Sequence, residues 1–373
     1  MPISSNQPSQ LLEAIAEELD ISDFHYQQAV QRYKSIGEHL ERKESKVARY
    51  RPEICPQGSF ALGTVTRPIF DIDELDLVCE LNLQRDKITQ KDLKNLVGYE
   101  IILYTCANNI NSPVKEGRRC WTLSCADSAQ FHMDILPAIP DTDPLTPIWS
   151  DFAIVITDNT LPNYSHISFD WPRSNPKGYA AWFRSRMEIE FNARRKLLAE
   201  SMQARIEEVP EYKVKTPLQR AIQILKRHRD IMFVNDQENK PISIIITTLA
   251  AHAYSNESDL LDALQNLVKD MPRYIRSING VTWIPNPVNP LENFADKWQE
   301  HPQREKNFHR WLKQVQQDLD KALELADIPG VAESLKPNLG ERVVNQALRS
   351  LAESQNHYPA LDLRVTPIKP HAW

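Results

Sequence analysis

The chain contains 373 residues, of which 41% are hydrophobic and 25% are charged, an ordinary composition for a folded protein of two or three domains. Lys and Arg number 44 and Asp and Glu number 50, so the net charge is −6, and no long basic run is present. Because sequence-independent binding of nucleic acid depends on clustered Lys and Arg, this composition disfavours a protein that holds a long DNA or RNA strand.

Glycine is scarce, with 9 residues in the whole chain, and its spacing excludes two common nucleotide-binding loops. No two glycines stand two positions apart, which excludes the Gly-x-Gly-x-x-Gly loop of Rossmann dehydrogenases. Gly58 and Gly63 have the outer spacing of a Walker A loop, but Thr64 and Val65 follow where that loop needs Lys and Ser or Thr. The sequence therefore excludes the P-loop class as well.

The cysteines and the hydropathy pattern indicate a cytoplasmic protein. The five cysteines are an odd number without a Cys-x-x-Cys pair, and the N-terminus has no apolar core of a secretory signal. The longest apolar stretch, 244–251, is far shorter than the ~20 residues of a membrane helix, so no membrane partner is expected. A zinc site formed by Cys106, Cys120, Cys125 and His132 is disfavoured, because the spacings match no compact zinc finger.

The first half of the chain is predicted to mix helices and strands. Ser22 is a suitable N-cap for a long helix over 23–50. Its apolar positions are Phe24, Val30, Tyr33, Ile36 and Leu40, which from Val30 onward stand three or four residues apart. Short runs of strand-forming residues follow at 75–81, 121–128 and 131–139, with a helix predicted from Thr89 to about Ala107.

The second half is predicted to be helical. Thr216 is a suitable N-cap with Pro217 at the first helical position. Helical periodicity covers 178–200, 218–233, 243–254, 258–271 and 305–325. A proline-rich loop is predicted at 283–298 and a polar tail at 355–373. The fold class predicted is therefore α+β, with a mixed-sheet lobe over residues 1–205, an all-helical lobe over 206–373 and a ligand site in the cleft between them.

Chemistry-bearing residues concentrate between positions 55 and 81. Gly58 and Ser59 precede a predicted helix start, where backbone N–H groups can hold a phosphate. An acidic cluster follows, formed by Asp71, Asp73, Glu74 and Asp76. Since strand residues two apart face the same side, either Glu74 and Asp76 or Asp71 and Asp73 would present two carboxylates together.

A third carboxylate comes from a distant strand. Asp134 lies within an apolar run, where a charged side chain is costly unless it is paired or binds a metal. Three carboxylates that converge from two strands supply the hard oxygen ligands that a pair of Mg²⁺ ions needs.

These segments carry a resemblance to a known family. Residues 57–64 together with 75–81 resemble the nucleotidyltransferase motif of the DNA polymerase beta superfamily, and 131–140 resembles the strand of its third carboxylate. In the second half, the chain resembles the bacterial cyclic GMP-AMP synthase/DncV-like nucleotidyltransferases (CD-NTases), whose helical lobe is shared with oligoadenylate synthases. The segments that carry this second resemblance are 216–230, 243–254 and 286–298. The resemblance covers nearly the whole chain.

The resemblance implies a function. It implies a nucleotidyltransferase that makes a cyclic di- or trinucleotide second messenger from NTPs, ATP among them, by two-metal phosphoryl transfer in antiphage (CBASS) signalling. Mg²⁺ or Mn²⁺ would be the cofactor, and accessory and effector proteins of such a system would be the partners. No DNA activator is expected, because neither a zinc insertion nor a basic DNA-binding surface is visible.

The same resemblance implies roles for individual residues. The triphosphate contacts would be Gln57, Gly58, Ser59, Lys226 and Ser243, and the metal-binding catalytic carboxylates would be Glu74, Asp76 and Asp134. The family's first two metal ligands form an Asp-hydrophobic-Asp pattern, whereas this chain has Glu74-Leu75-Asp76. Glu keeps the charge but moves the oxygens by more than an ångström, so Asp73 is the alternative first ligand.

Two other functions stay open at this point. One is another nucleotidyltransferase of the superfamily, a polymerase or a tRNA-end adding enzyme, which the absence of a basic track disfavours. The other is a catalytically weak nucleotide-binding module, which only the Glu at position 74 favours.

Overall fold

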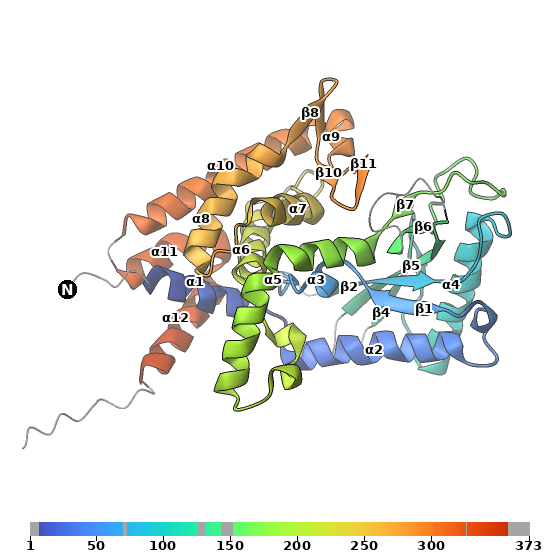
Figure 1. The fold of residues 1–373 in the computed structure, drawn as a ribbon, viewed down its shortest axis with the longest axis horizontal. Coiled ribbons are helices and arrows are strands. Elements are labelled where there is room, and N and C mark those ends of the chain that lie inside the picture. The colour runs from blue at the N-terminus through green and yellow to red at the C-terminus, as the bar shows by residue number, and fades with distance from the viewer. Residues whose placement is uncertain (1–6, 70–72, 126–130, 143–151, 326, 357–373) are drawn as a thin grey trace, which may run out of the picture.

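The structure, a computed structural model, describes residues 7–69, 73–125, 131–142, 152–325 and 327–356. A mixed sheet with helices along it lies at one end of the molecule, and a larger group of helices lies at the other (Figure 1). Among the described helices, none is both long enough and apolar enough to cross a membrane. The predicted polar tail lies outside the described residues from position 357 onward.

Within the described residues, seven strands form one mixed sheet. They are β1 (Glu53–Pro56), β2 (Asp73–Glu80), β3 (Lys115–Glu116), β4 (Trp121–Cys125), β5 (Phe131–Pro140), β6 (Ile154–Ile156) and β7 (Arg173–Ser174). The order is β1-β2-β5-β4-β3, and β6 pairs with the far half of β5 and with β7. The central strands β2 and β5 run parallel, while the other pairs are antiparallel. The strands predicted at 75–81 and 131–139 are confirmed, as is the strand predicted at 121–128 up to Cys125, whereas its residues 126–128 lie outside the described residues.

Helices α2 (Asp23–Glu41) and α4 (Gln90–Ala107) cover one face of this sheet (Figure 1). The predicted N-cap of α2 is present, since the Ser22 hydroxyl accepts a hydrogen bond from the His25 N–H at 3.2 Å. Thr89, predicted as the start of the second helix, is the N-cap of α4, and its hydroxyl accepts a hydrogen bond from the Asp92 N–H at 3.0 Å. The core under the two helices comprises Ile36, Leu40, Val97 and Ile101 of the helices with Leu75, Leu77, Met133 and Ile135 of the strands.

The prediction for α2 is wrong in two details. The helix ends at Glu41 instead of continuing to residue 50, where a short 3₁₀ helix lies. Phe24 is 62% exposed instead of packed in the core. The reason is that the first turns of α2 do not face the sheet, since Tyr26 stacks on Tyr212, with 4.2 Å between ring centroids.

The alternation of β2 and β5 separates apolar side chains from charged ones. Leu75 and Leu77 point toward α2 and α4, so Asp76 lies on the opposite face of β2. On β5, Met133 and Ile135 lie in the same core, so Asp134 lies on that opposite face as well. A smaller apolar cluster continues this second face, formed by Val78, Leu136, Ala138, Ile154 and Ile156.

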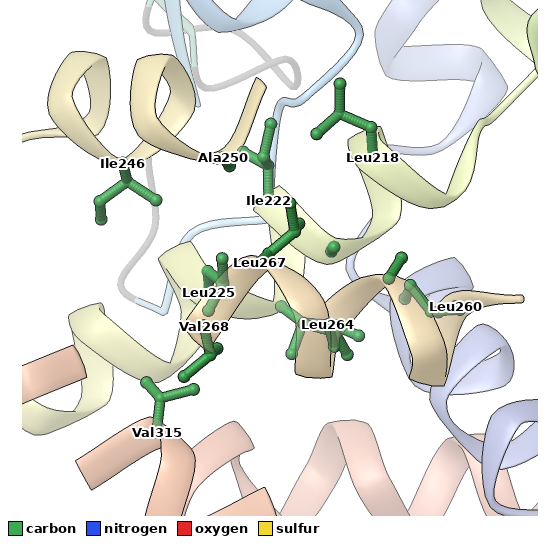
Figure 2. Close-up of a cluster of buried hydrophobic side chains, with 14 of the residues drawn as sticks. Leu218, Ile222, Leu225, Ile246, Ala250, Leu260, Leu264, Leu267, Val268 and Val315 are labelled. Atoms are coloured by element: carbon green, nitrogen blue, oxygen red, sulfur yellow. The ribbon is translucent and has the colours of Figure 1, made fainter. Parts of the chain in front are cut away.

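The second lobe is built around one buried helix. Its helices are α6 (Pro217–Met232), α7 (Ser243–Ala253), α8 (Leu260–Asp270), α9 (Asp296–Glu300), α10 (Pro302–Leu323), α11 (Ile328–Leu339) and α12 (Glu341–Asn356). Thr216 caps α6 in a reciprocal capping box with Gln219, and Pro217 is the first helical residue, as predicted. Figure 2 shows apolar side chains of α6, α7 and α8 gathered between these helices.

Two helices from the first half of the chain also pack into this helical core. One is α1 (Gln7–Glu18), which the sequence analysis did not identify and which contributes Leu11 and Ile15. The other is α5 (Pro176–Ser201), which contributes Phe183 and Phe191. The domain boundary at residue 205 stays a prediction, and the apolar contacts of α1 and α5 reach across it.

The helical lobe also contains short strands in its described part. Strands β8 (Arg276–Ile278) and β9 (Val281–Trp283) form one hairpin, and β10 (Pro285–Asn286) pairs with β11 (Asn289–Asn293) within the predicted proline-rich loop. The first hairpin turns at Asn279 and Gly280, which both have positive φ, as an Asn-Gly hairpin turn requires. The predicted α+β class with a mixed-sheet lobe and a second, mostly helical lobe is confirmed, but the second lobe is not all-helical as predicted, because it contains these hairpins.

Candidate active site

Helix α3 (Gly58–Leu62) begins directly beside strand β2. The N–H of Gln57, its N-cap residue, donates a hydrogen bond to the main-chain carbonyl of Asp76 at 2.8 Å. Gly58 has a φ of +60°, and a Cβ atom there would lie 2.5 Å from Oδ2 of Asp76. Glycine is therefore required at position 58 both by its backbone conformation and by the carboxylate that lies against it.

Asp76 and Asp134 lie in direct register on the parallel strands β2 and β5. Thr122 of β4 is the register partner of Asp134 on its other side, and its hydroxyl donates a hydrogen bond of 2.5 Å to Oδ1 of Asp134. Burial, together with the charge of Asp134, raises the pKa of the Cys120 thiol to about 11, so this thiol stays protonated at neutral pH. The two carboxylates thus share one face of the sheet, and Thr122 fixes one of them.

The identity of the first predicted metal ligand stays a prediction. Glu74 is the register partner of His132, whose Nδ1 lies 2.9 Å from the Ser124 hydroxyl. The side chains of Asp73 and Glu74 lie outside the described part of the structure, as does Asp71 altogether.

Lys226 of α6 points at the segment that follows α3. Its ammonium group is buried, with the residue only 4% exposed, and donates to the carbonyl of Thr64 at 3.1 Å and to the hydroxyl of Thr64 at 3.2 Å. Burial, together with the nearby Arg229, lowers the pKa of Lys226 to about 7, although Asp230 and Asp76 oppose the shift. Lys226 is therefore within electrostatic reach of the Asp76 carboxylate.

Ser243 is linked to Lys226 through an arginine. It is the first residue of α7, and its hydroxyl accepts a hydrogen bond of 2.8 Å from Nη1 of Arg229. Arg229 also donates to the carbonyl of Pro241 at 3.1 Å and pairs with Asp230 at 2.7 Å. Arg229 and the Ser243 hydroxyl therefore lie together at the start of α7, and Arg229 is near enough to Lys226 to lower its pKa.

Sequence reasoning missed Thr122 and Arg229. Arg229 stands three residues after Lys226, which puts both on one face of α6, so its position was readable from the helical period. Thr122 could not be found in this way, because its contact with Asp134 depends on the register between β4 and β5.

Among the side chains that the structure describes, no three His, Cys, Asp or Glu residues lie together as a metal site. The disfavoured zinc site of Cys106, Cys120, Cys125 and His132 is thus not assembled from its described members, and the Cys125 side chain lies outside them.

A cavity of about 610 Å³ lies against α3. Phe60 and Gly63 bound it on one side, and Tyr26, Tyr212 and Lys215 bound it on others. Its walls come from both predicted lobes, but neither Asp76 nor Asp134 lines it. Helix α3 therefore has the Asp76 carboxylate against its first residue and the cavity along its side.

Lys226→Met should change how stability depends on pH in the metal-free protein. The folded protein releases the Lys226 proton near pH 7, whereas the unfolded chain retains it up to the ordinary lysine pKa of 10.5. Between these values the unfolded state binds more protons, so the wild type should gain stability over the variant as pH rises, by up to about 1.4 kcal/mol per pH unit. Below pH 7 Lys226 is charged in both the folded and the unfolded state, so its contribution to the stability difference no longer changes with pH.

Urea unfolding at about pH 7 and about pH 9 measures this difference. Lys91→Met, at an exposed position of α4, controls for the replacement of a lysine by methionine. A stability difference between wild type and Lys226→Met that is the same at both pH values would contradict the prediction.

Comparison with known proteins identifies relatives over nearly the whole length. No protein-family model matches the chain. A c-di-GMP synthase of Roseivirga ehrenbergii is 31% identical over 366 residues, which span 95% of this chain and 91% of that protein. The cyclic dinucleotide synthase CdnG of Bradyrhizobium diazoefficiens is 25% identical over 349 residues, which span 86% of this chain and 78% of that protein.

Solved structures share the fold. The structure of Bradyrhizobium diazoefficiens CdnG, solved in complex with GTP, matches with a TM-score of 0.72 at 23% identity, over 92% of this chain and 99% of that one. E. coli CdnC with ATP matches with a TM-score of 0.60 at 15% identity, over 89% and 96%. DncV of Vibrio cholerae, a cyclic AMP-GMP synthase solved with a linear intermediate, matches with a TM-score of 0.54 at 14% identity, over 92% and 87%. With a relative of 31% identity along almost its entire length, the chain belongs to the bacterial CD-NTase family of nucleotidyltransferases, which produce cyclic oligonucleotides.

Proposed function

We propose that the protein joins two GTP molecules into a cyclic dinucleotide at the site formed by Asp76, Asp134 and the start of α3. The observation that carries the proposal is the direct register of Asp76 and Asp134 on one face of the sheet, with Gly58 against Asp76. Guanine as the base is supported by two relatives, one named c-di-GMP synthase and the other solved in complex with GTP. ATP, which the sequence analysis expected, is the alternative substrate, and CdnC with ATP supports it.

The residues present suit Mg²⁺ or Mn²⁺. Asp76 and Asp134 offer carboxylate oxygens from adjacent strands, the donors that these hard cations prefer, and we propose Glu74 as the third ligand. Position 74 stands two residues before Asp76 on β2, so strand alternation gives it the same face. When bound, the metal supplies positive charge to the phosphate oxygens and acidifies the attacking hydroxyl.

The chain's own groups would then orient the two nucleotides. Asp134, held by Thr122, is placed to accept the proton of the attacking ribose hydroxyl. The main-chain N–H groups of Gly58 and Ser59, next to Gln57, would bind the triphosphate of the donor, as would Lys226 and Ser243. Arg229 adds a further cation there, because it already binds the Ser243 hydroxyl.

The reaction balances as two transfers. In each, a bond forms between a ribose oxygen and an α-phosphorus, the bond from that phosphorus to the β-phosphate oxygen breaks, and pyrophosphate leaves. The linear product of the first transfer must turn within the site so that its remaining triphosphate is attacked by its own free hydroxyl. A ring of two nucleotides thus releases two molecules of pyrophosphate.

We place the product in antiphage (CBASS) signalling as a second messenger, with accessory and effector proteins as partners. This part of the proposal rests on the family resemblance. The net charge of −6 supports a synthase that needs no DNA activator, because duplex DNA would have to bind a protein without a basic run.

A nucleotide-binding module with little or no catalysis is the second candidate, which the Glu at position 74 favours. Such a protein would bind GTP without releasing pyrophosphate. The same assay therefore separates the two functions.

Mass spectrometry of the product made from all four NTPs with Mg²⁺, together with pyrophosphate release, tests the proposal. We expect a cyclic dinucleotide that contains guanine. Asp76→Ala combined with Asp134→Ala should abolish product while the fold persists, since removing adjacent carboxylates relieves their mutual repulsion. Asp320→Ala, an exposed acid of α10, is the control and should be fully active. Product formation by the double variant would refute the assignment of the site.

The first ligand can be identified by a second set of variants. If Glu74 binds the metal, Glu74→Ala should cost as much activity as Asp76→Ala, and Glu74→Asp should be mild or faster. Asp73→Ala should then be nearly silent, because neighbouring strand residues face opposite sides. Pyrophosphate release at saturating Mg²⁺ measures all four variants. If Glu74→Ala keeps its rate of pyrophosphate release and Asp73→Ala loses it, Asp73 and not Glu74 is the first metal ligand.

Gly58→Ala should reduce activity by at least about a hundredfold, because its Cβ would displace the Asp76 carboxylate by an ångström or more. Gly280→Ala is the matched control. Gly280 also has a positive φ, of 78°, but a Cβ there meets nothing within 4 Å. It should therefore lower the stability through backbone strain of about 1 kcal/mol and leave the rate of the folded protein unchanged. Equal losses of activity in both variants would mean that strain, and not the carboxylate contact, is responsible.

A further inference from the structure

Four consecutive backbone carbonyls, those of residues 62–65 at the end of α3 and directly after it, each accept a hydrogen bond from a side chain at or just before α6. Gln219 donates to Leu62 at 2.9 Å, and Gln223 donates to Val65 at 2.7 Å. Between them, Lys215 donates to Gly63 at 2.8 Å and Lys226 donates to Thr64 at 3.1 Å. We call these four donors, Lys215, Gln219, Gln223 and Lys226, the clamp.

The clamp follows from the sequence of α6. Gln219, Gln223 and Lys226 are spaced four and three residues apart, so they form one face of the helix. All three are buried, and buried polar groups must find partners. The apolar residues between them, such as Ile222 and Leu225, belong to the helical core. The polar face of α6 therefore has the 62–65 backbone as its partner.

The clamped segment is in turn fixed to α3. The N–H of Thr64 donates to the carbonyl of Ser59 at 2.9 Å, and Gly63 ends the helix with a φ of +65°. Beside the 610 Å³ cavity, Phe60 stacks on Tyr26 with 4.9 Å between ring centroids, and Leu62 packs in the helical core. The clamp adds hydrogen bonds to this packing and fixes the backbone at the end of α3.

We propose that Gln219 and Gln223 are positioning residues of the nucleotide site, which hold Gly58 and Ser59 in place by fixing the backbone of residues 62–65. The inference rests on the proposed function, because it assigns to α3 the binding of the donor triphosphate. A helix of five residues has little stability of its own, so its orientation is set by what holds its two ends. At one end the Gln57 N–H bonds to β2, and at the other end the clamp bonds to residues 62–65.

An amide side chain is suited to both positions. Gln219 accepts a hydrogen bond from the Thr216 N–H at 2.9 Å through Oε1, which caps α6, while Nε2 donates to Leu62. Nε2 of Gln223 donates both to Val65 and to Oδ1 of Asp20, each at 2.7 Å. A carboxylate would lose the donors, and a lysine would lose the acceptor that caps α6.

Gln223→Met tests the inference, because it keeps the length of the side chain and removes both donors. Gln219→Glu is the second variant: it keeps the acceptor that caps α6 and loses the donor to Leu62. Asp318→Ala is the control for general damage to α6, since it removes the 2.9 Å partner of the buried His228. His228 lies beside Leu225, Val315 and Leu335, away from the clamp.

Three quantities are measured for each variant: amide hydrogen exchange of residues 59–65, the Kd of a non-hydrolysable GTP analogue, and KM and kcat from pyrophosphate release. All three variants should lose thermal stability. Only the two Gln variants should show faster exchange at 59–65 and a rise of at least tenfold in Kd and KM for the nucleotide. Asp318→Ala should keep the wild-type Kd and KM.

Kd and KM within twofold of wild type in both Gln variants would overturn the inference, even if exchange rises, because the clamp would then be structural only. The same rise of Kd in Asp318→Ala would overturn it too, because the effect would follow from lost stability. A wild-type protein that binds the analogue but releases no pyrophosphate would refute the proposed catalysis, and the Kd and exchange values would still decide the role of the clamp.

Discussion

Hydrogen bonds between the polar face of α6 and the backbone of residues 62–65 hold the sheet lobe to the helical lobe. Every residue of α6 from Pro217 to Arg229 is buried, so the helix cannot turn its polar side chains to water. One face packs in the helical core, and the other must find acceptors, which the carbonyls of residues 62–65 and the Asp20 carboxylate provide. This single helix thus joins the sheet lobe to the helical core, and the nucleotide site proposed above lies where they join.

The sheet contributes a second constraint, since its alternation places charge where the helices cannot cover it. Leu75 and Leu77 face α2 and α4, which forces the Asp76 carboxylate to the other face, and the parallel register brings Asp134 alongside. Two neighbouring carboxylates repel each other, and the buried Lys226 offsets part of the charge at Asp76. Two carboxylates on one face of the sheet suit the cation site proposed above, because hard cations prefer carboxylate oxygens.

The local features of the fold were predictable from the sequence, and the long-range ones were not. Caps such as Thr89 and Thr216 act within one helical turn, so their residue types alone locate the helix starts. Asp76 and Asp134 could be selected because a charge inside an apolar strand is unusual.

By contrast, the hydrogen bond from Gln223 to Val65 joins residues 158 positions apart, and no local sequence pattern predicts it. The Asn279-Gly280 hairpin was a local signal that the sequence analysis did not use. The choice between Asp73 and Glu74 depends on side chains outside the described residues and stays a prediction.

The comparisons also limit what the fold can explain. DncV is a cyclic AMP-GMP synthase, and the Roseivirga relative is a c-di-GMP synthase, yet DncV shares this fold at 14% identity. Proteins that share a fold and differ in product must differ in the side chains that contact the bases, because backbone elements and metal-binding carboxylates treat every nucleotide alike. In the function proposed above, the carboxylates on β2 and β5, the start of α3 and the clamp from α6 all act on phosphates and ribose hydroxyls. They would account for the transfer common to the family, whereas the choice of base must then come from side chains that none of these elements supplies.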